Sequence, residues 1–519
     1  MDAAPRATAH PLLINVKEQL SEMDRLDNSK HAGKFSISDS KDVYGELTFA
    51  GLNTSLYLRD EALINPHGIP GQCVKGVLHD LTKVTLVQCV TTSGPGYSTR
   101  GAEKYHFATI FPHYVAYGDH HIAPNESMIT EAHFVLDDAS TLFYDFDAFG
   151  SLINARPYIE QIVTANNLGR VIATGSEPEI LYFAGKREIF AVDTILGKIS
   201  AQHNPISNIG GPNGVSLKNE ISVTISFSRP VTFHESIDHT STLLRFFEIL
   251  VGRQQNVFSY SLGIRSDGDR IERLFVYWSA LPDRGSSRDH GRPDPADVLL
   301  DAIQEQDMFS RVLSSWLDRD NERRDARGRF ASSFSQRRYS IDRLIGAANM
   351  FDILPDSAAP KKVALSEEIE KAKQECQHIV KKLEKSLEMK SLLDALGRLG
   401  NSSLKHKIRY RGEFISAAVG MRFPDLLQII DQAVDCRNYY VHGGKSKFDY
   451  NKEFDAVCFF TDTLEFVFAA SDLIEAGWNI SSWINSPTSE SHPFGSYRVN
   501  YSVNLVKLRS LLNLSADSN

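Results

Sequence analysis

The segment FPDLLQIIDQAVDCRNYYVHGG, residues 423–444, decides which fold the second half of the chain adopts. Its apolar residues recur at the spacing of one face of an amphipathic helix. These residues are Leu426, Leu427, Ile430, Val434 and Val441. Two glycines follow, and glycine is common just past the end of a helix. We therefore predict a helix over residues 423–442 that carries Arg437, Asn438 and His442 in its last turns.

Helical periodicity continues on both sides of this segment, so we predict an all-α bundle over residues 301–519. Residues 451–476 are apolar around most of the helix circumference and should lie at the centre of the bundle. Residues 366–399 begin with a serine that can cap a helix and with acidic residues, and they are expected to form one long helix. The expected helices are residues 297–317, 334–352, 366–399, 404–419, 423–442, 451–476 and 500–512.

The first half of the chain has the pattern of β-strands. Short runs of β-branched and aromatic residues alternate with Gly, Pro, Asn and Asp, which are strand and turn signals. The clearest runs are residues 44–60, 76–89, 105–118, 220–233 and 271–281, with helices expected at 157–167 and 241–252. The predicted parts are a β-rich module over 1–160, a second β-rich or α+β module over 161–285 and a polar linker over 286–300.

The composition is that of a globular protein with several cores. At 519 residues the chain is too long for one ordinary domain. A net charge of -9 argues against a uniformly basic nucleic-acid coat, although local basic patches can still gather phosphate. The 5 cysteines include no CxxC pair, which suits a reducing compartment. No export signal or membrane-length apolar run is present, so we predict a cytoplasmic protein that has no membrane segment, metal or cofactor.

Two motifs near the end of the predicted helix compete for interpretation. The string GGKS, residues 443–446, is similar to the end of a phosphate-binding P-loop. That loop needs a glycine where this chain has Tyr439, and it follows a strand rather than a helix. An arginine followed after four to six residues by a histidine is the other motif, and it recurs along the chain at Arg25–His31, Arg100–His106, Arg229–His234, Arg284–His290 and Arg437–His442.

Only the last of these pairs lies on a predicted amphipathic helix. A five-residue step along a helix turns by about 140° and rises about 7.5 Å, so we expect Arg437 and His442 to straddle a groove. Asn438 should lie between them in height. His442 is placed at the helix C-terminus, where the helix dipole favours the cationic form of histidine.

The end of this helix carries a resemblance to a known family. RNYYVHGG, residues 437–444, has an arginine, a polar second residue, three further residues and a histidine at a helix end in a C-terminal helical domain. It resembles the Apea-like HEPN family of bacterial anti-phage abortive-infection proteins, whose N-terminal region is also β-rich. The resemblance covers most of the chain. It implies a multidomain fold, with a β-rich N-terminal half containing some helix, followed by an all-α HEPN helical bundle.

The resemblance implies an RNA endonuclease toxin of phage defence. HEPN nucleases pair two bundles around one metal-independent site, which implies a homodimer. His442 would take a proton from an RNA 2'-OH, Arg437 would hold the phosphate and Asn438 would orient a catalytic group or bind a phosphate oxygen. The products would be 2',3'-cyclic phosphate and 5'-OH ends, and family analogy extends to tRNA as a target. The β-rich half would sense a phage-derived trigger or restrain the bundle.

Basic and aromatic residues near the motif fit an RNA path. Lysine and arginine attract phosphate, and tyrosine rings stack on exposed bases. The predicted RNA-binding residues are Lys405, Lys407, Arg409, Arg411, Tyr439, Tyr440, Lys445 and Lys447. A denser run of arginines between residues 323 and 343 is either a second part of this path or a solvated helix face.

Two other functions remain open from the sequence. The bundle can be a non-catalytic RNA-binding or dimerisation module whose motif is only a helix end. It can also be half of a toxin–antitoxin pair that is silenced by nucleotidyl transfer to a tyrosine. That mode is associated with a tyrosine two residues after the histidine, and this chain has Gly444 there.

Overall fold

The computed structural model describes residues 28–38, 41–61, 73–91, 96–100, 103–165, 174–209, 212, 214–265, 271–279, 293–336, 338–360, 365–397, 399–400 and 402–516. The chain forms two compact units. The β-rich unit consists of residues 1–247 and 255–310, and the helical unit consists of residues 248–254 and 311–519. The expected boundary at residue 160 and the expected linker stay predictions, and residues 286–292 of that linker lie outside the described residues.

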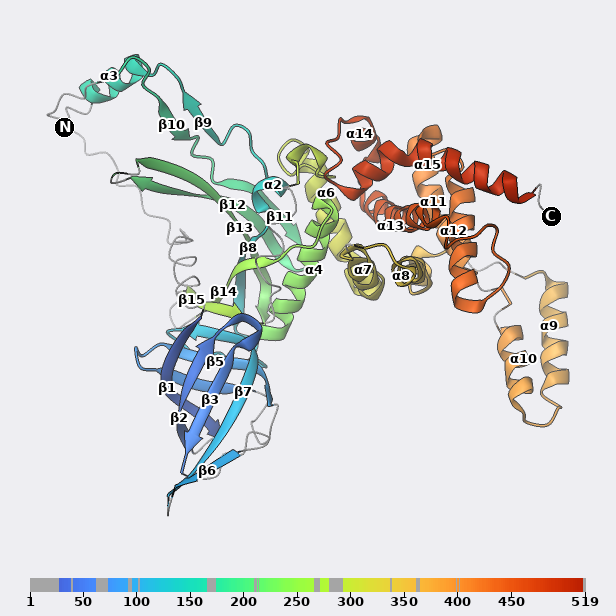
Figure 1. Ribbon diagram of the computed structural model, residues 1–519, viewed down its shortest axis with the longest axis horizontal. Coiled ribbons are helices and arrows are strands. Elements are labelled where there is room, and N and C mark those ends of the chain that lie inside the picture. The colour runs from blue at the N-terminus through green and yellow to red at the C-terminus, as the bar shows by residue number, and fades with distance from the viewer. Residues whose placement is uncertain are drawn as a thin grey trace. The chain divides into compact units, whose positions relative to one another are not determined.

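The β-rich unit is organised around one long antiparallel sheet (Figure 1). The order of its hydrogen-bonded strands is β11-β12-β13-β8-β14-β15-β7-β3-β2-β1-β4-β5, and β6 also pairs with β7. The strands are β1 (Ser29–Ser38), β2 (Lys41–Phe49), β3 (Ser55–Asp60), β4 (Val74–Leu78), β5 (Lys83–Thr91), β6 (Gly96–Arg100), β7 (Glu103–Gly118), β8 (Ile129–Leu136), β11 (Glu188–Thr194), β12 (Gly197–Ile209), β13 (Val215–Val231), β14 (Val257–Arg265) and β15 (Ile271–Trp278).

In the described part of the chain, strands β1 to β5 close into a ring with β7. The ring closes because β7 pairs with β3 on one side and with β5 on the other. Side chains alternate between the two faces of each strand, so that every second residue of β4 is buried. The inward side chains form an apolar core that includes Phe35, Leu47, Leu58 and Val84, which are fully buried.

Helix α4 (Phe233–Val251) lies on the second part of this sheet, where Thr240 Oγ1 is 3.1 Å from Tyr260 Oη of β14. The sequence-based start at residue 241 was wrong. The helix begins earlier because Thr232 and Glu235 form a reciprocal capping box: Glu235 N–H donates to Thr232 Oγ1 over 3.2 Å, and Thr232 N–H donates to Glu235 Oε2 over 2.8 Å. A smaller sheet of β9 (Phe149–Leu152) and β10 (Ile180–Phe183) accompanies α2 (Ala139–Leu142) and α3 (Arg156–Ala165).

The helical unit surrounds one buried helix, α13 (Phe454–Ala476). The other helices are α6 (Gln306–Asp318), which starts in the β-rich unit, α7 (Asp320–Phe334), α8 (Ile341–Asp352), α9 (Glu367–Val380), α10 (Leu387–Gly397), α11 (Leu404–Val419), α12 (Leu426–His442), α14 (Ile480–Asn485) and α15 (Pro493–Ala516). Aromatic residues of α13 and α15 pack around Phe423, and the ring of Tyr501 lies edge-on to it at 4.9 Å between ring centroids. The prediction that residues 451–476 form the central helix is confirmed.

The single long helix predicted over residues 366–399 is wrong. The chain turns after Val380 and starts α10 at Leu387, so α9 and α10 form a helical hairpin (Figure 1). Ser386 explains the break because its Oγ accepts a hydrogen bond from Met389 N–H over 3.2 Å, which caps a new helix. Ser386 therefore marks the start of a second helix within the segment for which the apolar pattern predicts one helix.

Two other helix predictions differ from the structure for local reasons. The helix expected from residue 297 starts at Gln306, because Asp301 Oδ1 accepts from the N–H groups of Ile303 and Gln304 and holds a turn there. The helix expected over residues 334–352 begins at Ile341, because Ser340 caps α8 by accepting from Arg343 N–H over 3.1 Å. Within the described residues, no helix has both the length and the apolar content for a membrane span.

Candidate active site

Helix α12 places the candidate residues at its exposed C-terminal end. Its apolar face is buried in the bundle through Leu426, Ile429, Ile430, Ala433, Val434 and Cys436. The helix stops at Gly443, whose N–H donates to Tyr439 O over 3.1 Å and whose φ of +72° favours glycine. His442 is the last helical residue. The glycines are therefore part of a helix end, as the sequence indicates.

Arg437 lies at the centre of a small polar cluster. Its Nη1 donates to Asn438 Oδ1 over 3.0 Å and contacts His442 Nε2 at 3.2 Å. Its Nη2 donates to Asn349 Oδ1 over 2.8 Å. The expectation that Arg437 and His442 straddle a groove was wrong, because the long arginine side chain spans the five-residue step that separates the two backbone positions.

A hydrogen bond between Arg437 Nη1 and His442 Nε2 requires one particular proton arrangement of the histidine ring. Arginine only donates hydrogen bonds, so His442 Nε2 accepts and the ring carries its proton on Nδ1. The contact therefore uses the neutral ring, whereas the helix end favoured the cationic form. In this arrangement His442 presents the form of histidine that can act as a base.

The sequence did not predict Asn349 as a partner of Arg437. It lies on α8, 88 residues before Arg437, and no short-range motif connects the two positions. One local signal was available: Asn349 is a lone amide within an apolar stretch whose neighbours Ala348, Met350 and Phe351 are fully buried. A polar side chain in such a stretch needs a hydrogen-bond partner.

The basic string KHKIRYR lies on α11, and acidic groups of neighbouring helices engage most of it. Lys405 Nζ is 3.2 Å from Asp435 Oδ1, and Arg409 Nη1 is 2.8 Å from Asp431 Oδ2. Lys407 Nζ donates to the carbonyl of Asp352 over 2.8 Å.

Arg411 differs from the other three because it is buried. Its side chain is only 2% exposed and donates to Glu475 Oε2 over 2.6 Å and to Ser471 Oγ over 2.9 Å. This burial excludes Arg411 from the RNA-binding residues that the sequence predicts.

The tyrosines after Arg437 form an aromatic cluster. Tyr439 and Tyr440 are 5.1 Å apart between ring centroids, and both contact the ring of Tyr450. Burial raises the pKa of Tyr450 to about 12, with further contributions from neighbouring groups. Tyr439 and Tyr440 are half-buried, so parts of both side chains remain accessible. Lys445 and Lys447 follow in an exposed segment and have no ion-pair partner among the described residues.

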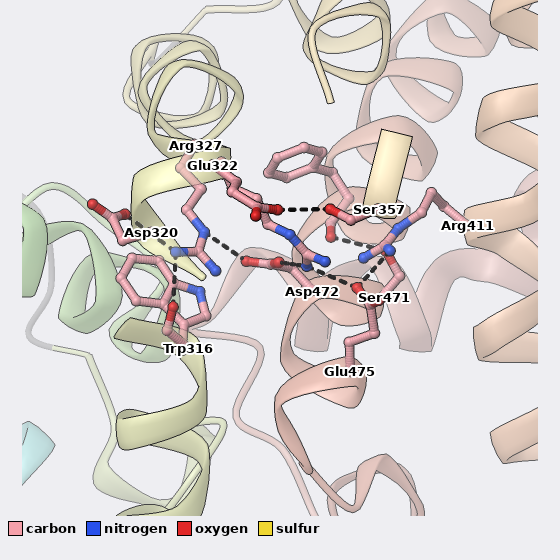
Figure 2. Close-up of polar contacts among 11 residues, drawn as sticks. Trp316, Asp320, Glu322, Arg327, Ser357, Arg411, Ser471, Asp472 and Glu475 are labelled. Atoms are coloured by element: carbon pink, nitrogen blue, oxygen red, sulfur yellow. Dashed lines mark hydrogen bonds and ion pairs between the residues drawn. The ribbon is translucent and has the colours of Figure 1, made fainter. Parts of the chain in front are cut away.

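The arginine run between residues 323 and 343 does not form one exposed path. Figure 2 shows Arg327 between Asp320 and Asp472, with its guanidinium 3.6 Å from the Trp316 ring centroid. Arg323 also binds Asp472, and Arg343 binds Glu465 of α13. These three arginines are neither part of an RNA path nor part of a solvated helix face, so both expectations were wrong for them. They are buried partners of α13 carboxylates. Of the others, Arg324, Arg329 and Arg338 are exposed, and Arg337 lies outside the described residues.

Two histidines of the β-rich unit contact residues of its sheet. His121 contacts the carbonyl of Val84 at 3.1 Å, and His133 contacts Glu131 and Thr224. Within the described residues, no group of three or more His, Cys, Asp or Glu side chains is placed to hold a metal. Arg25, Arg284 and His290 of the competing Arg–His pairs lie outside those residues.

Comparison with protein families supplies an independent observation. The family model described as ApeA N-terminal domain 1 matches residues 30–316, and the model described as Apea-like HEPN matches residues 345–481. The chain belongs to the ApeA-like HEPN family. Comparison with curated proteins gave no match, and comparison with solved structures gave none.

The two matches agree with the architecture of the chain. The ApeA N-terminal domain 1 match begins within β1 and extends past β15, and the Apea-like HEPN match begins within α8 and extends past α13. Family membership supports a HEPN nuclease in anti-phage defence. Asn349, Arg437, Asn438 and His442 all lie inside the HEPN match.

Proposed function

We propose that this ApeA-like HEPN protein is a metal-independent RNA endonuclease toxin that acts in abortive infection. The carrying observation is the contact of Arg437 Nη1 with His442 Nε2 at 3.2 Å, with Asn438 on the same nitrogen. This arrangement brings together a phosphate-binding cation and a neutral histidine base at an accessible helix end. These are the groups that 2'-OH attack on a phosphodiester needs.

The proposed reaction begins when His442 Nε2 accepts the proton of an RNA 2'-OH. The 2'-oxygen attacks the adjacent phosphorus, and the bond from phosphorus to the 5'-oxygen breaks. Arg437 stabilises the negative charge that develops on the phosphate, and Asn438 orients the guanidinium. The departing 5'-oxygen takes a proton from water or from His442 of a second copy. The products are a 2',3'-cyclic phosphate and a 5'-OH, and DNA is not cut because it lacks the 2'-OH.

The RNA-binding surface is proposed around this helix end. Lys445 and Lys447 are exposed and follow His442 directly, and Tyr439 and Tyr440 lie one turn earlier. Lys405, Lys407 and Arg409 would contribute from α11 if a phosphate competes with their present partners. A single-stranded loop would let bases reach the tyrosines, and tRNA offers such loops.

The homodimer is also a proposal. One copy holds one His442, and a second histidine would complete acid–base catalysis at the leaving oxygen. HEPN domains typically oligomerise and bind RNA, which supports a dimer through the bundle. We place this protein in the cytoplasm, where its RNA substrate would be present.

The β-rich unit is proposed to sense a phage-derived trigger or to restrain the nuclease. A cavity of about 490 Å³ in this unit supports the sensing role. Its wall includes the stacked rings of Tyr117 and Phe275, 5.6 Å apart, and the charged side chains of Asp80, Asp119 and Arg273. Aromatic walls with a few charged groups are typical of ligand sites.

The test is RNA cleavage by purified full chains. His442→Ala and Arg437→Ala should each lower the cleavage rate at least about 100-fold, the lower range for losing a general base or a charge-stabilising donor. His378→Ala is the matched control, because His378 occupies the last turn of α9 in the same unit. Cleavage should persist in EDTA. Undiminished cleavage by both site variants refutes the catalytic assignment, and RNA binding without cyclic-phosphate ends supports a non-catalytic binding module.

A further inference from the structure

The hydrogen-bond acceptors of the Arg437 side chain lie on two different helices. Asn438 and His442 belong to α12, the helix that carries Arg437 itself. Asn349 is the partner from another helix, and its bond is the shortest of the three at 2.8 Å. Two acceptors on α12 move together with the arginine backbone. The acceptor on α8 is therefore the group that can fix the guanidinium relative to the rest of the bundle.

Helix α8 is a rigid support for this purpose. Ala347, Ala348, Met350 and Phe351 surround Asn349 in sequence and are fully buried. The start of the helix is also fixed, because Ser340 caps it and Arg343 Nη2 binds Glu465 Oε2 over 2.7 Å. A side chain on such a helix keeps its place when a substrate binds nearby.

We propose that Asn349 is a positioning residue for Arg437, an inference that rests on the proposed nuclease function. A guanidinium has five N–H groups. The observed bonds use both N–H groups of Nη1 and one of Nη2. Nε–H is buried and has no acceptor among the described residues. One Nη2–H therefore remains for a phosphate oxygen, and Asn349 sets the direction in which it points.

The choice of an amide has a chemical reason. Asn349 Oδ1 accepts a hydrogen bond without carrying charge, so it holds the guanidinium and leaves its positive charge for the phosphate. An aspartate at this place would hold the arginine more tightly and would also neutralise it. A leucine would fill a similar volume and hold nothing. These two substitutions separate positioning from charge.

The experiment measures kcat and KM for cleavage of a short RNA by full-length wild type, Asn349→Leu and Asn349→Asp. Asn349→Leu should lower kcat about 10- to 100-fold, the usual effect of removing a group that orients a functional side chain. Asn349→Asp keeps an acceptor for Arg437, so it should lower kcat less than Asn349→Leu does, and it should raise KM because its charge repels the RNA phosphate. Asn485→Leu is the matched control, since Asn485 Oδ1 accepts from Arg422 Nη2 over 2.8 Å away from the candidate site.

The outcomes separate this inference from the proposed function. If wild type cleaves, His442→Ala does not, and Asn349→Leu has the wild-type kcat, the positioning role is refuted while the nuclease assignment stands. A loss of kcat of the same size in Asn349→Leu and Asn349→Asp also refutes it, because an acceptor would then not be the important property. If His442→Ala cleaves like wild type, the proposed function itself fails. Thermal midpoints within about 4 °C of wild type show that a kcat loss is not unfolding.

Discussion

The buried ion-pair network around α13 gives the sharpest prediction about stability. Asp472 Oδ1 binds Arg323 Nη1 at 2.6 Å. Asp472 Oδ2 binds Arg327 Nε at 2.9 Å, as Figure 2 shows. The side chains of Asp472, Arg323 and Arg327 are 3%, 4% and 1% exposed. Asp472→Asn keeps the shape of this residue, removes its charge and points an N–H donor at a guanidinium. Removing one partner of a buried pair costs about 3 to 5 kcal/mol in the free energy of unfolding.

The pH dependence follows from the same contacts. Burial alone would raise the pKa of Asp472, but the guanidinium groups of Arg327, Arg323 and Arg411 outweigh it and lower the pKa to about 2. A carboxylate with a lowered pKa stabilises the fold fully above its unfolded pKa, near 4, and this contribution disappears as the pH falls toward 2. The shift corresponds to about 2 to 3 kcal/mol. Asp472→Asn should abolish this part of the acid sensitivity.

The assay is urea unfolding of the full chain at pH 7, followed by tryptophan fluorescence. Trp316 reports on the network directly, because the Arg327 guanidinium lies 3.6 Å from its ring centroid. With a urea m-value of about 2 kcal/mol/M, a loss of about 4 kcal/mol moves the midpoint of the helical unit by about 2 M. Asp425→Asn is the control at a more exposed ion pair with Arg509, and it should cost at most about 1 kcal/mol. An Asp472→Asn midpoint equal to that of Asp425→Asn refutes the reasoning.

Two further predictions concern ligand contacts. Lys445→Ala combined with Lys447→Ala should weaken RNA binding and reduce the slope of log affinity against log salt by about 1.4, because two contacts to single-strand phosphates are lost. Filter binding measures this slope, and an unchanged slope would show that RNA binds elsewhere. Lys452→Ala is the control at an exposed lysine. Arg273→Gln at the cavity should abolish protection against phage in a plaque assay, while the purified variant should still cleave RNA. The control Arg229→Gln, on an exposed part of β13, should retain protection. Normal protection by Arg273→Gln would exclude a sensing role for the cavity.

The fold was predicted from sequence where periodicity was unambiguous. Helix α11 has the expected bounds, and α13 is central because its apolar residues cover most of the circumference. The errors arose at capping residues. Ser386 and Thr232 start helices within segments that the apolar pattern assigned differently. Both capping residues are visible in the sequence, but the spacing of the apolar residues around them predicts other helix bounds.

The candidate site was predictable only within one helix. The spacing from Arg437 to His442 and the glycine helix end are local, and they are visible in the sequence. Asn349 and Glu475 are distant partners that only the tertiary fold brings to Arg437 and Arg411. A basic run therefore cannot reveal which of its members is buried. The catalytic roles of Arg437, Asn438 and His442 stay predictions.

The partners of the arginines give a physical reason to separate structural from functional ones. Arg323, Arg327, Arg343 and Arg411 each bind a carboxylate, so the protein neutralises their charge inside the helical unit. The hydrogen-bond partners of Arg437 are neutral: two amide oxygens and an imidazole nitrogen. Neutral acceptors fix a guanidinium without cancelling its charge, and a half-buried cation that keeps its charge attracts an anion strongly. If the anion is an RNA phosphate bound at the remaining Nη2–H, a second phosphate oxygen would compete with His442 for Nη1–H and release the Nε2 lone pair of His442 for the 2'-OH proton. Substrate binding and base activation would then be one event at Arg437.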